Sequence, residues 1–177
     1  MNRLLRLAAA IDAVNRGIGR ASVWLILACV LISAATATVR YVLDWGSNGL
    51  LEIQWFLFGL VFLLSAAWTL QQDGHVRIDI LSARLPPRVR LWIDIAGGLL
   101  FLLPMCVLVA YYAWAFFLIS YGQNEASPNP GGLLWWPMKL VIPVAFVLLA
   151  AQGVSEIIKA TASLSGARPM PVRRGGH

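Results

Sequence analysis

Hydrophobic and polar positions divide the chain into four long apolar stretches separated by polar, charged connections. The stretches cover residues 21–39, 53–70, 91–120 and 140–155. An α-helix rises about 1.5 Å per residue, so the first stretch reaches about 28 Å and can cross a hydrocarbon core of about 30 Å. The pattern therefore predicts an all-α membrane protein with four transmembrane helices.

The basic residues fall almost entirely on one side of this four-span arrangement. Of the fourteen Lys and Arg residues, all except Arg40 and Lys139 lie before the first span, between the second and third, or after the fourth. Cytoplasmic loops carry the excess of Lys and Arg, so both termini are predicted to be cytoplasmic. We expect residues 1–160 to form a single four-helix membrane domain and residues 161–177 to form a disordered cytoplasmic tail.

The segment before the first span has its own periodicity. Apolar residues recur at helical spacing at Leu4, Leu7, Ala8, Ile11, Val14 and Ile18. Charged residues lie between them. This predicts an amphipathic N-terminal helix that lies in the cytoplasmic interface and leads into the first span. An A-x-A pattern at residues 35–37 resembles a signal-peptide cleavage site, but the leader and the span are both long for a signal, and three spans follow.

Composition and charge exclude several classes of protein. The chain is 59% hydrophobic and 12% charged, whereas a soluble domain is about 25% charged. Its net charge of +6 comes from basic residues dispersed around the ends of the spans. Nucleic-acid binding requires basic residues on one folded face together with stacking aromatics. The partner indicated by this charge is the lipid bilayer, with no nucleic acid.

The centres of the spans lack ionisable residues, which are the groups that pumps, proton relays and ion channels need there. His75 lies in the central loop and His177 is the last residue, so no span offers a histidine ligand to haem. Cys29 and Cys106 lack the spacing of a zinc site or a redox pair. With no recognisable nucleophile, base or metal set, we expect a non-enzymatic accessory or scaffold subunit without catalytic residues, metal or cofactor.

Prolines and small residues indicate how the spans are shaped and packed. Pro104 is expected to kink the third span, and Pro143 is placed in the first turn of the fourth, where its missing N–H is harmless. Ala21, Ala28 and Ala35 repeat every seven residues in the first span. Small residues permit close helix contact in lipid, and this stripe serves either internal packing or a partner.

Two polar spots are candidates for a structural or subunit-contact role. Glu52 begins the second span, with Arg40 across the preceding loop. It forms an ion pair with Arg40, faces the headgroups, or acts at an interface with another subunit. In the central loop His75, Arg77 and Asp79 alternate with apolar residues. Since a single strand would have no partner there, we expect a segment on the membrane surface.

Several motifs follow one another in a fixed order along the chain. They are Glu52 at the head of the second span, Gln71-Gln72-Asp73-Gly74, His75-Val76-Arg77-Ile78-Asp79-Ile80-Leu81, Leu85-Pro86-Pro87-Arg88 and Trp92-Ile93-Asp94. The outer loop, residues 124–133, and the run Trp135-Trp136-Pro137-Met138-Lys139 come after them. Over about residues 15 to 160, this order resembles the small membrane subunit (DctQ-like) of tripartite ATP-independent periplasmic (TRAP) transporters.

The resemblance implies a small permease subunit of a secondary importer of organic acids, in the bacterial inner (cytoplasmic) membrane. Its implied partners are a large membrane subunit, present as a separate chain, and an extracytoplasmic substrate-binding protein. The large subunit carries the substrate and sodium sites and moves as an elevator, while the small subunit acts as a static scaffold. Glu52 and the segment from His75 to Asp79 then become candidates for fixing subunit contacts or bundle geometry.

A second hypothesis is a self-sufficient four-helix exporter that works as a dimer with Glu52 or Asp94 as its proton-coupled site. Such small exporters place their essential carboxylate deep in a span, whereas both candidates lie near span ends. Substrate-dependent proton flux from the purified chain alone would favour this hypothesis.

Overall fold

The structure is a computed structural model that describes residues 2–72, 85–167 and 169. Its elements, in chain order, are α1 (Asn2–Leu43), α2 (Asn48–Gln71), α4 (Pro87–Gly97), the π-helix η1 (Gly98–Leu102), α5 (Leu103–Gly122) and α6 (Trp136–Leu164). Four helical segments are long and apolar enough to cross a membrane, with α4, η1 and α5 together forming the third. Over the described residues, the prediction of an all-α protein with four helices apolar enough to cross a membrane is confirmed.

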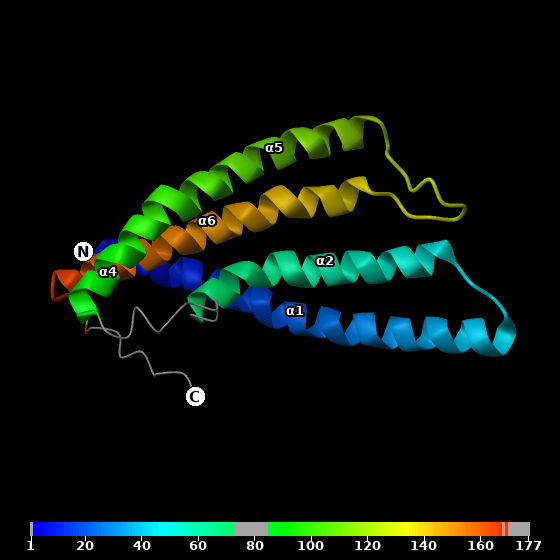
Figure 1. Cartoon of the computed structure of the whole chain (residues 1–177), viewed down its shortest axis with the longest axis horizontal. Helices are drawn as coiled ribbons and strands as arrows, with labels where there is room; N and C mark the ends of the chain where they lie inside the picture. Colours follow the sequence, from blue (N-terminus) through cyan, green and yellow to red (C-terminus); the bar gives the residue numbers. More distant parts are fainter. Residues whose placement is uncertain (1, 73–84, 168, 170–177) are drawn as a thin grey trace.

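The helices are arranged with α2 and α6 in the middle (Figure 1). α1 packs on α2 and α6, and α5 packs on α6. Successive spans run in opposite directions, so α1 begins and α6 ends at the same end of the molecule, which we call the termini end (Figure 1). The connections α1–α2 and α5–α6 lie at the opposite end, the loop end. α6 continues past residue 160, so the predicted tail boundary falls inside a helix.

Small residues dominate the contacts between the helices, while large apolar side chains face outward. The buried apolar residues include Ala8, Ala67, Ala113, Ala145 and Ala162, whereas large residues on every span are exposed. In lipid, large side chains lose nothing by facing hydrocarbon, and close packing of small residues holds helices together. This inverted distribution is that of a membrane-embedded bundle.

Two of the three alanines of the stripe expected on α1 do not face the other helices. Ala21 and Ala35 are exposed, while Ser22 and Thr36, one position later along the chain, are buried. Of the two uses left open for the stripe, internal packing or a partner, internal packing does not hold at these two positions. The packing face of α1 carries small hydroxyl-bearing residues: Ser22 donates to the carbonyl of Ile18 in its own helix, and Thr36 accepts from Gln54 Nε2 of α2.

The expected irregularity at Pro104 appears as a π-helical turn directly before it. The backbone N–H of Leu103 bonds to the carbonyl of Gly98, a spacing of five residues. Proline cannot donate to its preceding turn and its ring crowds the carbonyl four residues earlier, so the helix widens there. The π-helical turn packs against α6 at Gly153, where an added Cβ would lie 2.8 Å from Leu102 Cδ2.

The placement of Pro143 in the first turn of the fourth span is wrong. α6 begins at Trp136, with Pro137 in its first turn, and Pro143 lies buried inside the helix. The apolar run did not identify the start of this helix, because the start signal lies before it, in a proline within the first turn at Pro137.

We expect the substitution Gly19→Ala to destabilise the packing of α1 on α2. A Cβ at Gly19 would lie 2.5 Å from Trp68 side-chain atoms, too close for any real contact. Gly17→Ala is the matched control, because its Cβ would meet nothing within 4 Å and alanine favours a helix by about 1 kcal/mol. In thermal unfolding in detergent, Gly19→Ala should melt lower than the parent, and Gly17→Ala at the same temperature or higher. Equal melting of the two variants would contradict this close contact.

Candidate functional site

The loop end contains a buried carboxylate, that of Glu52 near the start of α2. Glu52 is 2% exposed. Its Oε2 accepts the backbone N–H of Leu133 at 2.8 Å, and its Oε1 accepts Nδ2 of Asn129 at 3.0 Å. The hydroxyl of Ser127 also donates to Oε1. Three donors from the α5–α6 connection, residues 123–135, thus converge on one side chain, and we call this set the Glu52 site.

The α5–α6 connection folds into a compact loop that presents these donors. An isolated β-bridge joins Ala126 to Leu134, and left-handed backbone at Asn124 (φ 48°) and Gly131 (φ 71°) reverses the chain. These are residue types that tolerate positive φ. Gly132 must lack a side chain, because a Cβ there would collide with Ser127 and approach Glu52 Oε1 to 2.9 Å.

A second contact joins this loop to the first turn of α2. Nδ2 of Asn48 donates to the carbonyl of Pro130 at 3.1 Å. Gly49 approaches the loop so closely that an added Cβ would lie 2.8 Å from the carbonyl oxygen of Gly131. The N-terminal end of α2 and the loop before α6 therefore form one unit.

The Glu52 site corrects two alternatives drawn from the sequence. Its carboxylate is buried against the α5–α6 loop, so it does not face the headgroups. Nor is it joined to Arg40, which is exposed, in any ion pair among the described residues. The partners of Glu52 come from the outer-loop motif, which the sequence showed only as a separate feature.

The same loop is anchored to α6 by an ion pair. Glu125 accepts from Lys139 Nζ, which also lies 4.0 Å from the centre of the Phe116 ring on α5. The hydrogen bond from Lys139 lowers the pKa of the Glu125 carboxyl below its ordinary value. One cation thus joins the loop, α5 and α6.

This ion pair predicts an acid-dependent loosening of the α5–α6 loop. Because the pKa of Glu125 is lower in the folded protein, the stability from the pair is complete above the ordinary glutamate pKa of 4.5 and is lost as the pH falls through the folded value. Protease cleavage within residues 123–135, followed with an acid-active protease, should accelerate below the ordinary pKa. Glu125→Gln should flatten this dependence, and an unchanged pH profile would contradict the role of the pair.

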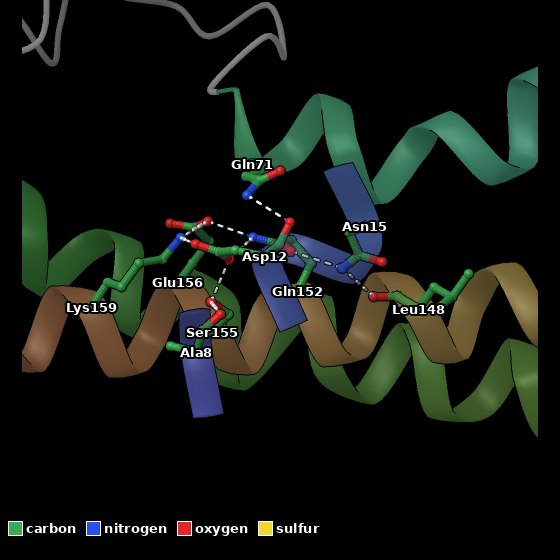
Figure 2. Close-up of polar contacts among 9 residues, drawn as sticks. All are labelled: Ala8, Asp12, Asn15, Gln71, Leu148, Gln152, Ser155, Glu156 and Lys159. Carbon is green, nitrogen blue, oxygen red and sulfur yellow. Dashed lines mark hydrogen bonds and ion pairs between the residues drawn. The ribbon is translucent and has the colours of Figure 1, made fainter. Parts of the chain in front are cut away.

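A larger polar cluster lies at the termini end, between α1 and α6 (Figure 2). At its centre, Asp12 Oδ1 accepts from Ser155 Oγ at 2.7 Å and from Gln152 Nε2 at 2.9 Å. Asp12 Oδ2 lies 3.0 Å from Lys159 Nζ. We call the following residues the Asp12 cluster: Asp12, Asn15, Gln152, Ser155, Glu156 and Lys159.

The remaining members complete the network. Asn15 Nδ2 donates to Gln152 Oε1 at 2.8 Å, and Gln152 Nε2 also donates to Glu156 Oε1 at 2.8 Å. Lys159 Nζ bonds to the same Glu156 oxygen at 2.6 Å. From α2, Gln71 Nε2 donates to the backbone carbonyl of Asp12 at 3.1 Å (Figure 2). α1, α2 and α6 are therefore tied at one level of the bundle.

Burial makes the Asp12 cluster energetically important. Asn15, Gln152 and Ser155 are at most 2% exposed. Buried polar groups are costly unless they are hydrogen-bonded. The sequence did not reveal this cluster, because Asp12 is one of the charged residues that alternate with the apolar positions of the predicted interfacial helix. The available signal was the spacing of Gln152, Ser155, Glu156 and Lys159, which places them along one side of α6.

The other predicted candidates, His75, Arg77 and Asp79, lie outside the described residues. Within the part of the chain that the structure describes, no group of three or more His, Cys, Asp and Glu side chains could hold a metal ion. The Glu52 site and the Asp12 cluster share one property, which is that their polar groups are used to join helices and loops of this chain.

Comparison with known families supports the architecture. The family model described as "Tripartite ATP-independent periplasmic transporters, DctQ component" matches residues 29–163, which is more than half of the chain and includes Glu52 and the α5–α6 loop. No match was found among curated proteins. The matched region contains the second and third spans entirely, the fourth except its last residue, and the first from residue 29 onward. The chain therefore belongs to the DctQ family, the small permease component of TRAP transporters.

Proposed function

We propose that this chain is the static scaffold of a sodium-coupled TRAP importer of organic acids. The observation that carries the proposal is that its helices are joined by buried polar contacts at both ends, through the Glu52 site and the Asp12 cluster. An elevator-type transporter needs a part that stays still while another part moves. A bundle fixed at both ends suits that part, and membership of the DctQ family supplies the transport context.

The proposal places the termini end in the cytoplasm and the loop end in the periplasm of a bacterial inner membrane. The charge distribution supports this orientation, because Arg3, Arg6 and Lys159 lie at the termini end. The α5–α6 loop, fixed by Glu52, then offers an ordered surface at which the extracytoplasmic substrate-binding protein docks. The N-terminal part of α1 lies against α6, at the cytoplasmic interface.

The large membrane subunit is proposed to contact the outward apolar faces of the spans. Phe101 on η1 and Tyr111 and Tyr112 on α5 are at least 65% exposed, and α5 packs mainly on α6 among the other three spans. His75, Arg77 and Asp79 remain proposed candidates for subunit contacts in the central loop. No catalytic step and no cofactor is assigned to this chain.

The exporter hypothesis receives no support from the geometry of Glu52. A proton-coupled carboxylate must exchange its proton with substrate or water, but both oxygens of Glu52 accept hydrogen bonds from the α5–α6 loop. The family match also assigns the chain to a multi-component transporter.

The proposal is tested by reconstituting uptake from purified components. The chain, the large subunit and the binding protein are combined in proteoliposomes under an inward sodium gradient, and uptake of an organic acid is measured with each component omitted in turn. We expect the chain to co-purify with the large subunit and uptake to fall to background without it. Full uptake by the large subunit and binding protein alone, or proton-coupled flux by the chain alone, would overturn the proposal.

A further inference from the structure

α1 is much longer than a membrane crossing requires. Its 42 residues correspond to about 63 Å, twice the hydrocarbon thickness of about 30 Å. The apolar stretch at 21–39 accounts for the crossing. Residues 2–20, which we call the N-terminal arm, continue the same helix toward the termini end, where the arm packs beside α6 (Figure 1).

The N-terminal arm has three distinct faces. The face against the rest of the protein carries the buried residues Ala8, Asn15 and Gly19, together with Asp12. An adjoining apolar face is exposed at Leu4 (50%), Leu7 (51%) and Val14 (55%). The remaining exposed surface carries the four arginines Arg3, Arg6, Arg16 and Arg20.

Charge complementarity identifies what the exposed faces fit. Asp12, the arm's one acidic residue, points into the protein and is paired with Lys159, so the exposed charge of the arm is entirely positive. An apolar face beside an arginine-rich face is the arrangement that binds the boundary between acyl chains and anionic headgroups. We propose that the N-terminal arm is a binding site for anionic phospholipid headgroups.

The Asp12 cluster gives this site a fixed orientation. An isolated amphipathic helix rolls freely at a membrane surface, whereas this arm is joined to α6 through Asp12 and Asn15. The arginines are therefore held together on one side before any lipid binds. Such preorganisation strengthens binding by lowering the ordering cost. Loss of the Asp12 contacts should weaken lipid selectivity even though every arginine remains.

The test measures lipid selectivity of the full-length chain on its own. The chain is reconstituted in nanodiscs of mixed phosphatidylglycerol and phosphatidylcholine, and the lipids that it retains on transfer to detergent are counted by native mass spectrometry. We expect the parent to retain phosphatidylglycerol preferentially and the variant R3Q/R6Q/R16Q/R20Q to lose most of that preference. Arg6→Gln should reduce it partially, and Asp12→Asn should also reduce it.

Arg40→Gln is the matched control for Arg6→Gln, because Arg40 is an exposed arginine of the same helix at the loop end. It should leave the preference unchanged. All four arm arginines are exposed, so the variants should melt like the parent, and the single variant provides the test where the fourfold one does not fold. Unchanged preference in the arginine variants, or an equal effect of Arg40→Gln, would overturn the proposal. The proposal would also be overturned if the arginine variants kept the lipid preference but lost the large subunit from the assembled transporter. That result would identify a protein as the occupant of the arm.

Discussion

Replacing Glu52 by Gln should release the α5–α6 loop from α2 although the side chain keeps its shape. All three partners of Glu52 donate hydrogen bonds, from Ser127, Asn129 and the Leu133 backbone. The amide of Gln supplies one acceptor and places an N–H₂ donor against the remaining donors. Removing one acceptor from a buried network costs about 1–3 kcal/mol, which raises the open population of the loop by about 5-fold to 150-fold.

Protease cleavage within residues 123–135 measures this opening, because cleavage follows the population of the open form when closing is fast. Asp44→Asn is the matched control. It also converts a carboxylate to an amide at the loop end, but Asp44 is exposed and its left-handed backbone (φ 50°) suits Asn. Cleavage of Glu52→Gln at the rate of Asp44→Asn would show that the carboxylate does not hold the loop.

The spans could be predicted from the sequence because the physical requirement is local. A run of about 20 apolar residues is enough to identify a helix that crosses hydrocarbon, and the four spans follow directly. The boundaries were less accurate where a helix continues beyond its apolar run. α1 extends to Asn2 and α6 starts at Trp136, because helix formation needs capping and tertiary packing and does not require apolar side chains throughout.

The partners of Glu52 could not be predicted, although the residue itself could be. Ser127, Asn129 and Leu133 lie 75, 77 and 81 positions away in the chain, and no local periodicity relates such distant residues. The resemblance to a known family identified both Glu52 and the outer-loop motif, but it did not indicate that the two are in contact. Their contact depends on the parallel placement of α2 beside α6, which is a property of the folded bundle.

The Asp12 cluster shows why helical periodicity alone gave an incomplete interpretation of the N-terminal arm. The arm does carry apolar and charged faces, but Asp12 and Asn15 lie on a third face that packs on α6. Periodicity alone groups every charged residue as polar surface. Separating Asp12 from the arginines required knowledge of which helix lies beside it.

Replacing Lys159 by Met should destabilise the bundle more than any other single change considered above. Lys159 is the cation shared by Asp12 and Glu156, and Met removes the charge while retaining a long apolar side chain. Two carboxylates then remain together without a cation. Breaking a buried pair from one side costs about 3–5 kcal/mol, and we expect about 3 kcal/mol because the Lys159 and Asp12 side chains keep 14% and 16% exposure. Urea unfolding in detergent micelles, followed by tryptophan fluorescence, measures the decrease in the free energy of unfolding.

The double variant Asp12→Asn with Lys159→Met should recover part of this loss. It removes the unpaired charge at Asp12, and Asn keeps one acceptor for Ser155. Glu156→Gln is the matched control, because the Glu156 side chain is 38% exposed and the amide oxygen still accepts from Gln152; its effect should remain below about 1 kcal/mol. If the double variant is as unstable as the sum of its single substitutions, Asp12 and Lys159 are not coupled. The N-terminal arm would then be held on α6 by apolar packing, and Asp12→Asn would leave its orientation unchanged.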